Sequence, residues 1–187
     1  TDTSESSDGW LFRGSVRTAL RMNIRPARPD DADAIARINV EMWRVAYAGI
    51  LPNRVLVNVS ISREKGGWSS TLLIRYWVYI AETENYGIVG FGSCGPQRLS
   101  NIKSEGEVYT LYFSSDFQGR GFGSSLMAFM FGALARDGQK FVIVWVFREN
   151  PFKYFCEAIG GRKIAERDER LWGVYPLDCL CVGRVQR

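Results

Sequence analysis

The spacing of hydrophobic positions changes several times along the chain, and each change predicts an element of secondary structure. Residues 22–25 predict a first strand. An apolar stripe then recurs at helical spacing, and it consists of Ile35, Ile38, Met42 and Val45. Asp30–Asp31 stand at the start of that helix as capping residues. Residues 51–73 predict a second, less regular helical region with a break at Gly66–Gly67.

In the second half of the chain, strands predominate. Residues 75–83 and 88–93 alternate in hydrophobicity around a short turn, which predicts a hairpin. The elements expected after it are a strand at 108–113, a helix at 124–137, a buried strand at 141–147, a short helix at 151–159 and strands at 163–166 and 171–175.

Composition places the chain among globular proteins of ordinary size. It has 187 residues, of which 46% are hydrophobic and 24% are charged, so one domain with a real core is expected. Residues 1–21 are polar without clear periodicity and predict a flexible extension, which leaves 22–187 as the domain. The net charge of +4 is dispersed; it suits an anionic ligand and argues little for nucleic acid.

The absence of histidine excludes several kinds of chemistry. Without it there is no Ser-His-Asp or Cys-His catalysis, no His-ligated zinc and no histidine base. The four cysteines (94, 156, 179 and 181) show neither metal-site nor disulfide-framework spacing, so a reducing cytoplasm is expected. No apolar run is long enough to span a membrane, and no signal peptide is visible.

The segment Gln118-Gly119-Arg120-Gly121-Phe122-Gly123 is the strongest functional signal. It lies between the strand at 108–113 and the helix at 124–137, so backbone N–H groups and the positive end of the helix dipole converge there on one anion, most often a phosphate. A P-loop would need a lysine after the last glycine, and the glycine spacing is wrong for a dinucleotide fingerprint. A glycine-rich turn without a ligand is the remaining structural alternative.

The pattern Gln-x-Arg-Gly-x-Gly after an apolar strand resembles the pyrophosphate loop of the GNAT N-acetyltransferase superfamily. Asn150-Pro151 followed by 155–161 (Phe-Cys-Glu-Ala-Ile-Gly-Gly) resembles a later motif of this family. Residues 28–31 and the string at 43–52 are similar to the opening of many bacterial members. The resemblance covers about 22–177 and implies an α+β (α/β) fold with a mixed sheet of six to seven strands, splayed between strands 4 and 5, and about four flanking helices.

The resemblance also implies acetyl transfer from acetyl-CoA to a primary amine in a ternary complex, without a metal. The pantetheine arm would lie in the splay between 108–113 and 141–147, where parted strands leave free backbone groups. The residues implied to bind acetyl-CoA are Leu111, Tyr112, Phe113, Gln118, Gly119, Arg120, Gly121, Phe122, Gly123, Ser124 and Asn150. For Asn150 the structural alternative is a capping residue before Pro151.

Catalysis requires a base because an ammonium ion is not a nucleophile. Glu107 precedes Gln118 by eleven residues, which matches the general-base glutamate of the histone-acetylating members; a solvated strand-end glutamate is the alternative. Cys156 stands where the family often has a tyrosine that protonates the leaving thiolate. It is either the acid or a small core residue.

The acceptor amine is left open by the sequence. Trp43, Tyr47 and Tyr109 could shape its pocket, although aromatic residues at helical spacing are usually core. A small polyamine, sugar amine, antibiotic amine or peptide N-terminus would each fit an amine-acetylating site. A non-catalytic acyl-CoA sensor and a nucleotide-binding module are the rival functions. The apolar C-terminal strand is compatible with a homodimer.

Overall fold

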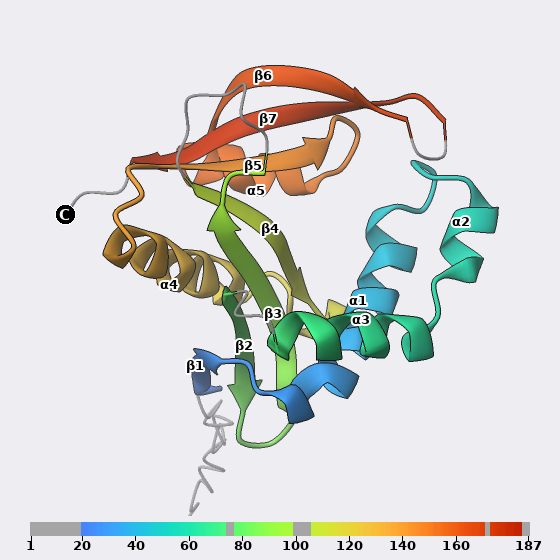
Figure 1. The fold of residues 1–187 in the computed structure, drawn as a ribbon, viewed down its shortest axis with the longest axis vertical. Coiled ribbons are helices and arrows are strands. Elements are labelled where there is room, and N and C mark those ends of the chain that lie inside the picture. Colours follow the sequence, from blue (N-terminus) through green and yellow to red (C-terminus); the bar gives the residue numbers. More distant parts are fainter. Residues whose placement is uncertain (1–19, 74–76, 99–105, 171–172, 185–187) are drawn as a thin grey trace, which may run out of the picture.

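A seven-stranded mixed sheet organises the computed structural model, which describes residues 20–73, 77–98, 106–170 and 173–184 (Figure 1). The strands are β1 (Met22–Pro26), β2 (Trp77–Thr83), β3 (Gly87–Pro96), β4 (Gly106–Phe113), β5 (Phe141–Phe147), β6 (Arg162–Glu169) and β7 (Tyr175–Arg184). The helices are α1 (Ala32–Ala46), α2 (Asn53–Asn58), α3 (Ile61–Leu73), α4 (Phe122–Arg136) and α5 (Phe152–Ala158), with 3-10 turns η1 (Pro29–Asp31) and η2 (Ser115–Phe117). The strand order is β1-β2-β3-β4-β5-β7-β6, and only β4 and β5 are parallel neighbours. The predicted mixed α+β fold is therefore confirmed.

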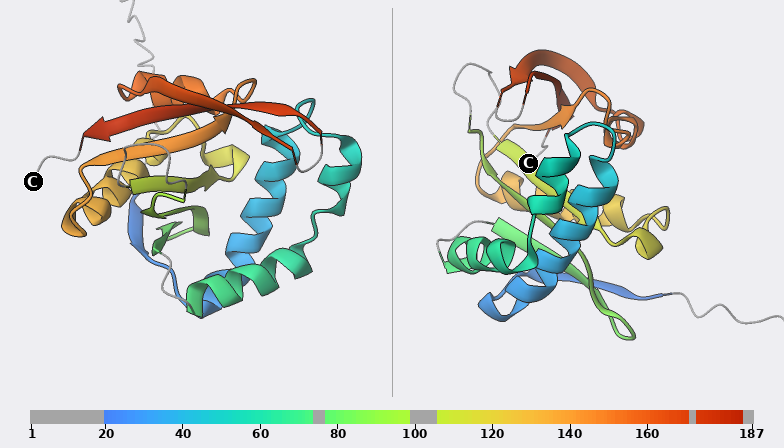
Figure 2. Two further views of the ribbon diagram at one scale, coloured as in Figure 1. Left: turned by 45° about the horizontal axis from the view of Figure 1, so that its top comes forward. Right: turned by 90° about the vertical axis from the view of Figure 1, so that its right-hand side faces the viewer.

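Helices cover both faces of the sheet and create two hydrophobic cores (Figure 2). On one face, α4 and α5 pack against the middle strands, with the side chains of Leu126, Met130 and Leu134 completely buried. On the other face, α1 contributes Ile35 and Met42 to a smaller core, against which α3 also packs. Strand β4 contributes to both cores, so its two faces lead to different sides of the molecule.

The helical region after α1 divides in a different place from the one expected. The predicted break at Gly66–Gly67 is wrong, because α3 runs through both glycines and the chain leaves the helical conformation at Val59 instead. Two interior glycines cost a helix about 2 kcal/mol relative to alanine. Packing of Trp68 and Leu72 against the smaller core offsets this cost, since burial of large apolar side chains stabilises by a similar amount.

The first helix also differs from its prediction in two details. Val45 is 56% exposed, so the apolar stripe ends at Met42 rather than continuing to the last turn. Asp31 occupies the N-cap position but its carboxylate makes no capping bond to α1. It accepts bonds from the Arg25 guanidinium at 2.7 and 3.0 Å and from the Arg28 backbone N–H at 2.7 Å. Through the bonds from Arg25, the Asp31 carboxylate connects β1 to the start of α1.

The C-terminal strand begins later than predicted. Of the strand expected at 171–175, residues 171–172 lie outside the described residues, and Gly173 forms a bend before β7 begins at Tyr175, so residues 173–174 were wrongly predicted. The observed strand lies between β5 and β6, where Leu177, Cys179 and Leu180 are buried. Most of the predicted extension at 1–21 lies outside the described residues, and the domain boundary at Met22 stays a prediction. None of the described helices has the length and apolar character needed to cross a membrane.

Candidate active site

Strands β4 and β5 separate soon after they meet. They pair at three positions only, Gly106 with Val142, Glu107 with Ile143 and Val108 with Val144. A bulge follows at once, because Ser93 of β3 pairs with Thr110 while Cys94 pairs with Val108, which leaves Tyr109 as the extra residue. From there to its end, β4 is paired with β3 alone. The splay expected between these strands is therefore present, and it exposes an edge of unpaired backbone groups.

The glycine-rich loop lies where β4 passes into α4. Gly119 and Gly121 have φ values of 69° and 81°, a left-handed conformation that other residues adopt only with strain. A Cβ on either glycine would meet no protein atom within 4 Å, so both face open space. Gly121 is the N-cap of α4 and provides no side chain to bond the first N–H groups of the helix. Free N–H donors at a helix start, together with the helix dipole, favour a bound anion.

Side chains of the loop itself hold it in place. The Gln118 amide nitrogen donates to the Phe113 carbonyl oxygen at 2.9 Å, which fixes the loop to the end of β4. The Arg120 Nε atom donates to the Asp116 carbonyl oxygen at 3.1 Å, and Arg120 is exposed at the surface. Gly123 differs from the other two glycines, because a Cβ there would lie 3.6 Å from the Phe155 ring of α5. An added methyl group would be in ordinary van der Waals contact with that ring.

Asn150 and Cys156 both have structural surroundings. The Asn150 Oδ1 atom accepts the Phe152 backbone N–H at 2.9 Å, so the side chain caps the start of α5. Cys156 is completely buried in the core beneath α4, and burial raises the pKa of its thiol to about 12. Tyr154, two residues before Cys156 on α5, is exposed.

Glu107 lies at the mouth of the splay, on the second of the three β4–β5 pairs. Its side chain is 1% exposed and is bound by Arg98. The Arg98 backbone N–H donates at 3.0 Å to one carboxylate oxygen, and the guanidinium donates to the other through Nε at 3.1 Å and through Nη2. The Arg98 guanidinium also stacks 4.4 Å from the centre of the Tyr109 ring. Tyr109 therefore contacts the same arginine that binds Glu107, and its role in the acceptor pocket stays a prediction.

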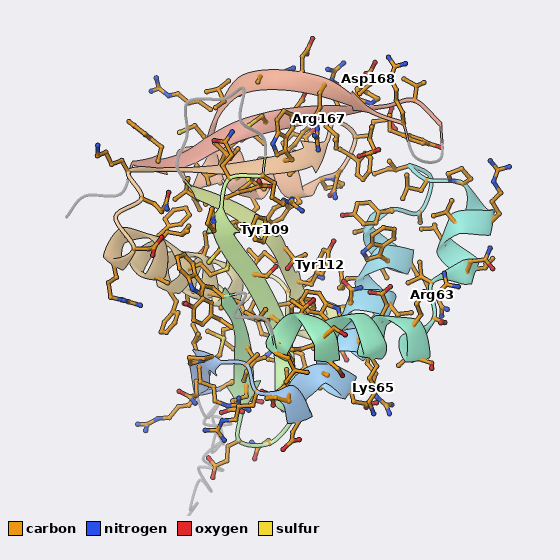
Figure 3. The ribbon with its side chains drawn as sticks, viewed as in Figure 1. Arg63, Lys65, Tyr109, Tyr112, Arg167 and Asp168 are labelled. Atoms are coloured by element: carbon orange, nitrogen blue, oxygen red, sulfur yellow. The ribbon has the colours of Figure 1, made fainter. Side chains whose placement is uncertain are left out.

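Trp43 and Tyr47 meet β4 at a different residue, Tyr112. The Tyr47 and Tyr112 hydroxyl oxygens are 2.9 Å apart, and the Trp43 and Tyr47 rings pack edge to face at 5.1 Å. Figure 3 shows Tyr109 and Tyr112 together on β4. Burial is the main cause that raises the pKa of the Tyr112 hydroxyl well above its usual value, and Tyr47 and Glu64 add to it. A hydrogen bond from the Trp43 side chain acts in the opposite direction.

Two residues of this region, and the contact made by the side chain of a third, could not be found from sequence spacing. Arg98 pairs with Glu107, Glu64 lies near Tyr112, and the Tyr112 side chain joins the aromatic group. Each meets its partner from another element, so no local pattern indicates the pair. Among the described residues, no three cysteine, aspartate or glutamate side chains gather as metal ligands would.

Known proteins share this architecture. The FR47-like protein family matches residues 98–172. An uncharacterized N-acetyltransferase of Bacillus subtilis, YuaI, is 30% identical over 153 residues, which cover 82% of this chain and 87% of that protein. An uncharacterized N-acetyltransferase of Archaeoglobus fulgidus is 30% identical over 135 residues, or 69% of this chain and 84% of that protein.

Solved structures with low sequence identity show the same fold. The PaiA N-acetyltransferase of Thermoplasma acidophilum, in complex with coenzyme A, has a TM-score of 0.68 at 16% identity, with 85% of this chain and 98% of that chain covered. YncA of Salmonella typhimurium, with acetyl-CoA, has a TM-score of 0.65 at 19% identity, with 89% and 95% covered. The chain belongs to the GNAT superfamily of N-acetyltransferases.

Proposed function

We propose that this chain transfers the acetyl group of acetyl-CoA to a primary amine that attacks the thioester directly in a ternary complex. The observation that carries the proposal is the splay of β4 from β5 beside the open glycine loop at the start of α4. A diphosphate needs converging N–H donors, and an amide-bearing arm needs free backbone groups. The two features supply both within one short segment of chain.

Acetyl-CoA fits the residues present. Gly119 and Gly121 leave room for a ligand against the backbone, and α4 directs its free N–H groups there. We assign the diphosphate to 118–124 and the pantetheine arm to the free edge of 111–113 and to the Asn150 amide nitrogen. The bound thioester would supply the electrophilic carbonyl. A backbone N–H near the bulge would stabilise the oxyanion that forms on it.

Glu107 is our candidate for the base because of its place at the mouth of the splay. Its carboxylate accepts three bonds from Arg98, and the oxygen that accepts only the Arg98 backbone N–H keeps a lone pair with which Glu107 would take the amine proton, directly or through water. We assign Cys156 to packing, because its side chain lies within the core beneath α4 and burial raises the pKa of its thiol to about 12, which makes it a poor acid. The leaving thiolate of CoA would then be protonated by water.

Calorimetric titration with CoA, followed by release of CoA thiol in the presence of an amine panel, tests this function. We expect Glu107→Gln to lower kcat by about 10²-fold or more, the usual contribution of a general base, with CoA affinity unchanged. Glu84→Gln makes the same change at an exposed turn and should have no effect. Tight CoA binding without turnover of any amine would instead identify an acyl-CoA sensor.

A further inference from the structure

A cavity of about 370 Å³ lies between α1, α2 and α3, on the side of the sheet opposite α4 and α5. Its lining consists of Trp43, Arg54, Val55, Asn58, Val59, Arg63 and Glu64. This volume is at the small end of the range for ligand pockets, which favours a small molecule over a protein surface.

The cavity leads to the splayed strand. Trp43 belongs to its lining and packs edge to face on Tyr47, whose hydroxyl oxygen lies 2.9 Å from that of Tyr112 on β4. Tyr112 lies beyond the last residue of β4 that pairs with β5. A molecule in the cavity would therefore have one end beside the strand on which we place the thioester. This connects the cavity to the proposed acceptor site.

The lining of the cavity carries two positive charges and one negative charge, and the two positive side chains come from different helices. Arg54 is on α2 and Arg63 is on α3, and no hydrogen bond or ion pair to another described residue occupies either guanidinium. Glu64 is the single carboxylate of the lining, and the Asn39 side chain holds it with a hydrogen bond of 2.8 Å. Two cations disfavour a polyamine, whereas a ligand with one anion and one ammonium would find a partner for each.

We infer that the acceptor is an amine that also carries a carboxylate, that is, an amino acid or a similarly small zwitterion. Arg54 and Arg63 would bind the carboxylate, because guanidinium groups match its geometry with paired N–H donors. Glu64 and the Trp43 ring would receive the ammonium group on the side of Tyr112. The inference rests on the proposed acetyltransferase function and specifies its substrate class.

The test compares acetyl transfer to the standard L-amino acids, to their C-terminal amides and to the polyamines putrescine and spermidine. We expect the best amino acid to exceed its own amide by about tenfold or more in kcat/KM, the effect of one charge-assisted hydrogen bond. Arg63→Gln and Arg54→Gln should each raise KM for the amino acid by about tenfold while leaving the amide unaffected. Arg63→Lys should restore part of the loss.

Lys65→Gln is the matched control for Arg63→Gln. It removes the same charge from the same helix, but Lys65 pairs with Asp33 at 3.2 Å and does not line the cavity. Figure 3 shows the positions of Arg63 and Lys65 on α3. The control should retain the KM of the unmodified protein for the amino acid.

The possible outcomes distinguish failure of the zwitterion assignment from failure of the proposed acetyltransferase function. Turnover of polyamines or amides at rates equal to or above those of amino acids would overturn the zwitterion assignment and leave the acetyltransferase intact. The zwitterion assignment would equally fail if Lys65→Gln raised KM as much as Arg63→Gln, because the effect would then be one of general charge. Absence of turnover with every amine, despite CoA binding, would overturn both.

Discussion

The sharpest test of the anion site is a comparison of alanine substitutions at the two ends of α4. Gly121 precedes the helix with φ of 81°, and Gly138 follows it with φ of 90°. Neither position has a protein atom within 4 Å of the added methyl group. The two substitutions therefore impose the same backbone strain without a clash, at opposite ends of the helix dipole.

The expected loss of stability is similar for both variants. A left-handed conformation costs a residue with a side chain about 1–2 kcal/mol, and alanine regains about 0.5 kcal/mol by restricting the unfolded chain. A net loss of about 1 kcal/mol lowers the Tm of a domain of this size by about 2–4 °C. Thermal and urea unfolding of Gly121→Ala and Gly138→Ala measure this common effect.

Affinity for CoA should separate the variants. If diphosphate oxygens accept N–H bonds at the start of α4, a methyl group at Gly121 occupies the space they approach and weakens at least one charge-assisted bond. That bond is worth about 1.5–3 kcal/mol, so Kd should rise by about tenfold or more. Gly138→Ala should bind CoA as the unmodified protein does in calorimetry. Equal affinities in the two variants would refute the placement of the diphosphate on this loop.

Three further predictions concern burial and packing. Cys156→Ala should keep kcat within about threefold and lose about 1 kcal/mol of stability in urea unfolding, since a small buried group is removed; loss of turnover would restore the thiol as the acid. Asp31→Asn should cost about 2 kcal/mol at neutral pH, because the carboxylate has two bonds from Arg25. Burial raises the pKa of Asp31, but the Arg25 and Arg28 bonds outweigh it and lower the pKa below 3.8. The difference between Asp31→Asn and the unmodified protein should thus persist above about pH 4 and vanish as the pH falls through the lowered value; a difference that stays constant down to pH 2 would contradict it. Gly90→Ala should lower stability by about 1–3 kcal/mol, because its methyl group would lie 2.3 Å from the Phe113 ring; an unchanged unfolding midpoint would show that the ring moves freely.

Features that depend on residues close together in the sequence could be predicted from the sequence. The loop at 118–123 follows from glycines that permit left-handed φ between a strand and a helix, and both elements are where they were expected. The splay followed from a resemblance and not from spacing, because pairing between β4 and β5 joins residues more than thirty positions apart. A helix break at Gly66–Gly67 was wrong because the packing of α3 overrides the weak preference of two glycines.

The acceptor side was harder to predict because its contacts are long-range. The hydroxyl pair of Tyr47 and Tyr112 joins positions 65 residues apart, and the Asn39–Glu64 bond joins positions 25 apart. Sequence periodicity assigns Trp43 and Tyr47 to a common wall, and the structure brings them together in a ring contact. Sequence periodicity gives no indication of which strand residue completes that wall.

The bulge at Tyr109 explains why Tyr112 is the strand residue that completes the wall formed by Trp43 and Tyr47. Gly106 and Val108 lie on the α4 side of the sheet, and strict alternation would place Thr110 and Tyr112 there as well. The extra residue reverses the phase, so that Leu111 joins Val108 in the core beneath α4 while Tyr112 turns to α1 and α3. One inserted residue thus ends the pairing with β5 and presents a hydroxyl group to the opposite face. Removal of the bulge would close the splay and also turn Tyr112 away from Tyr47 and from the core beneath α1 and α3, so both sides of the proposed site depend on a single feature of β4.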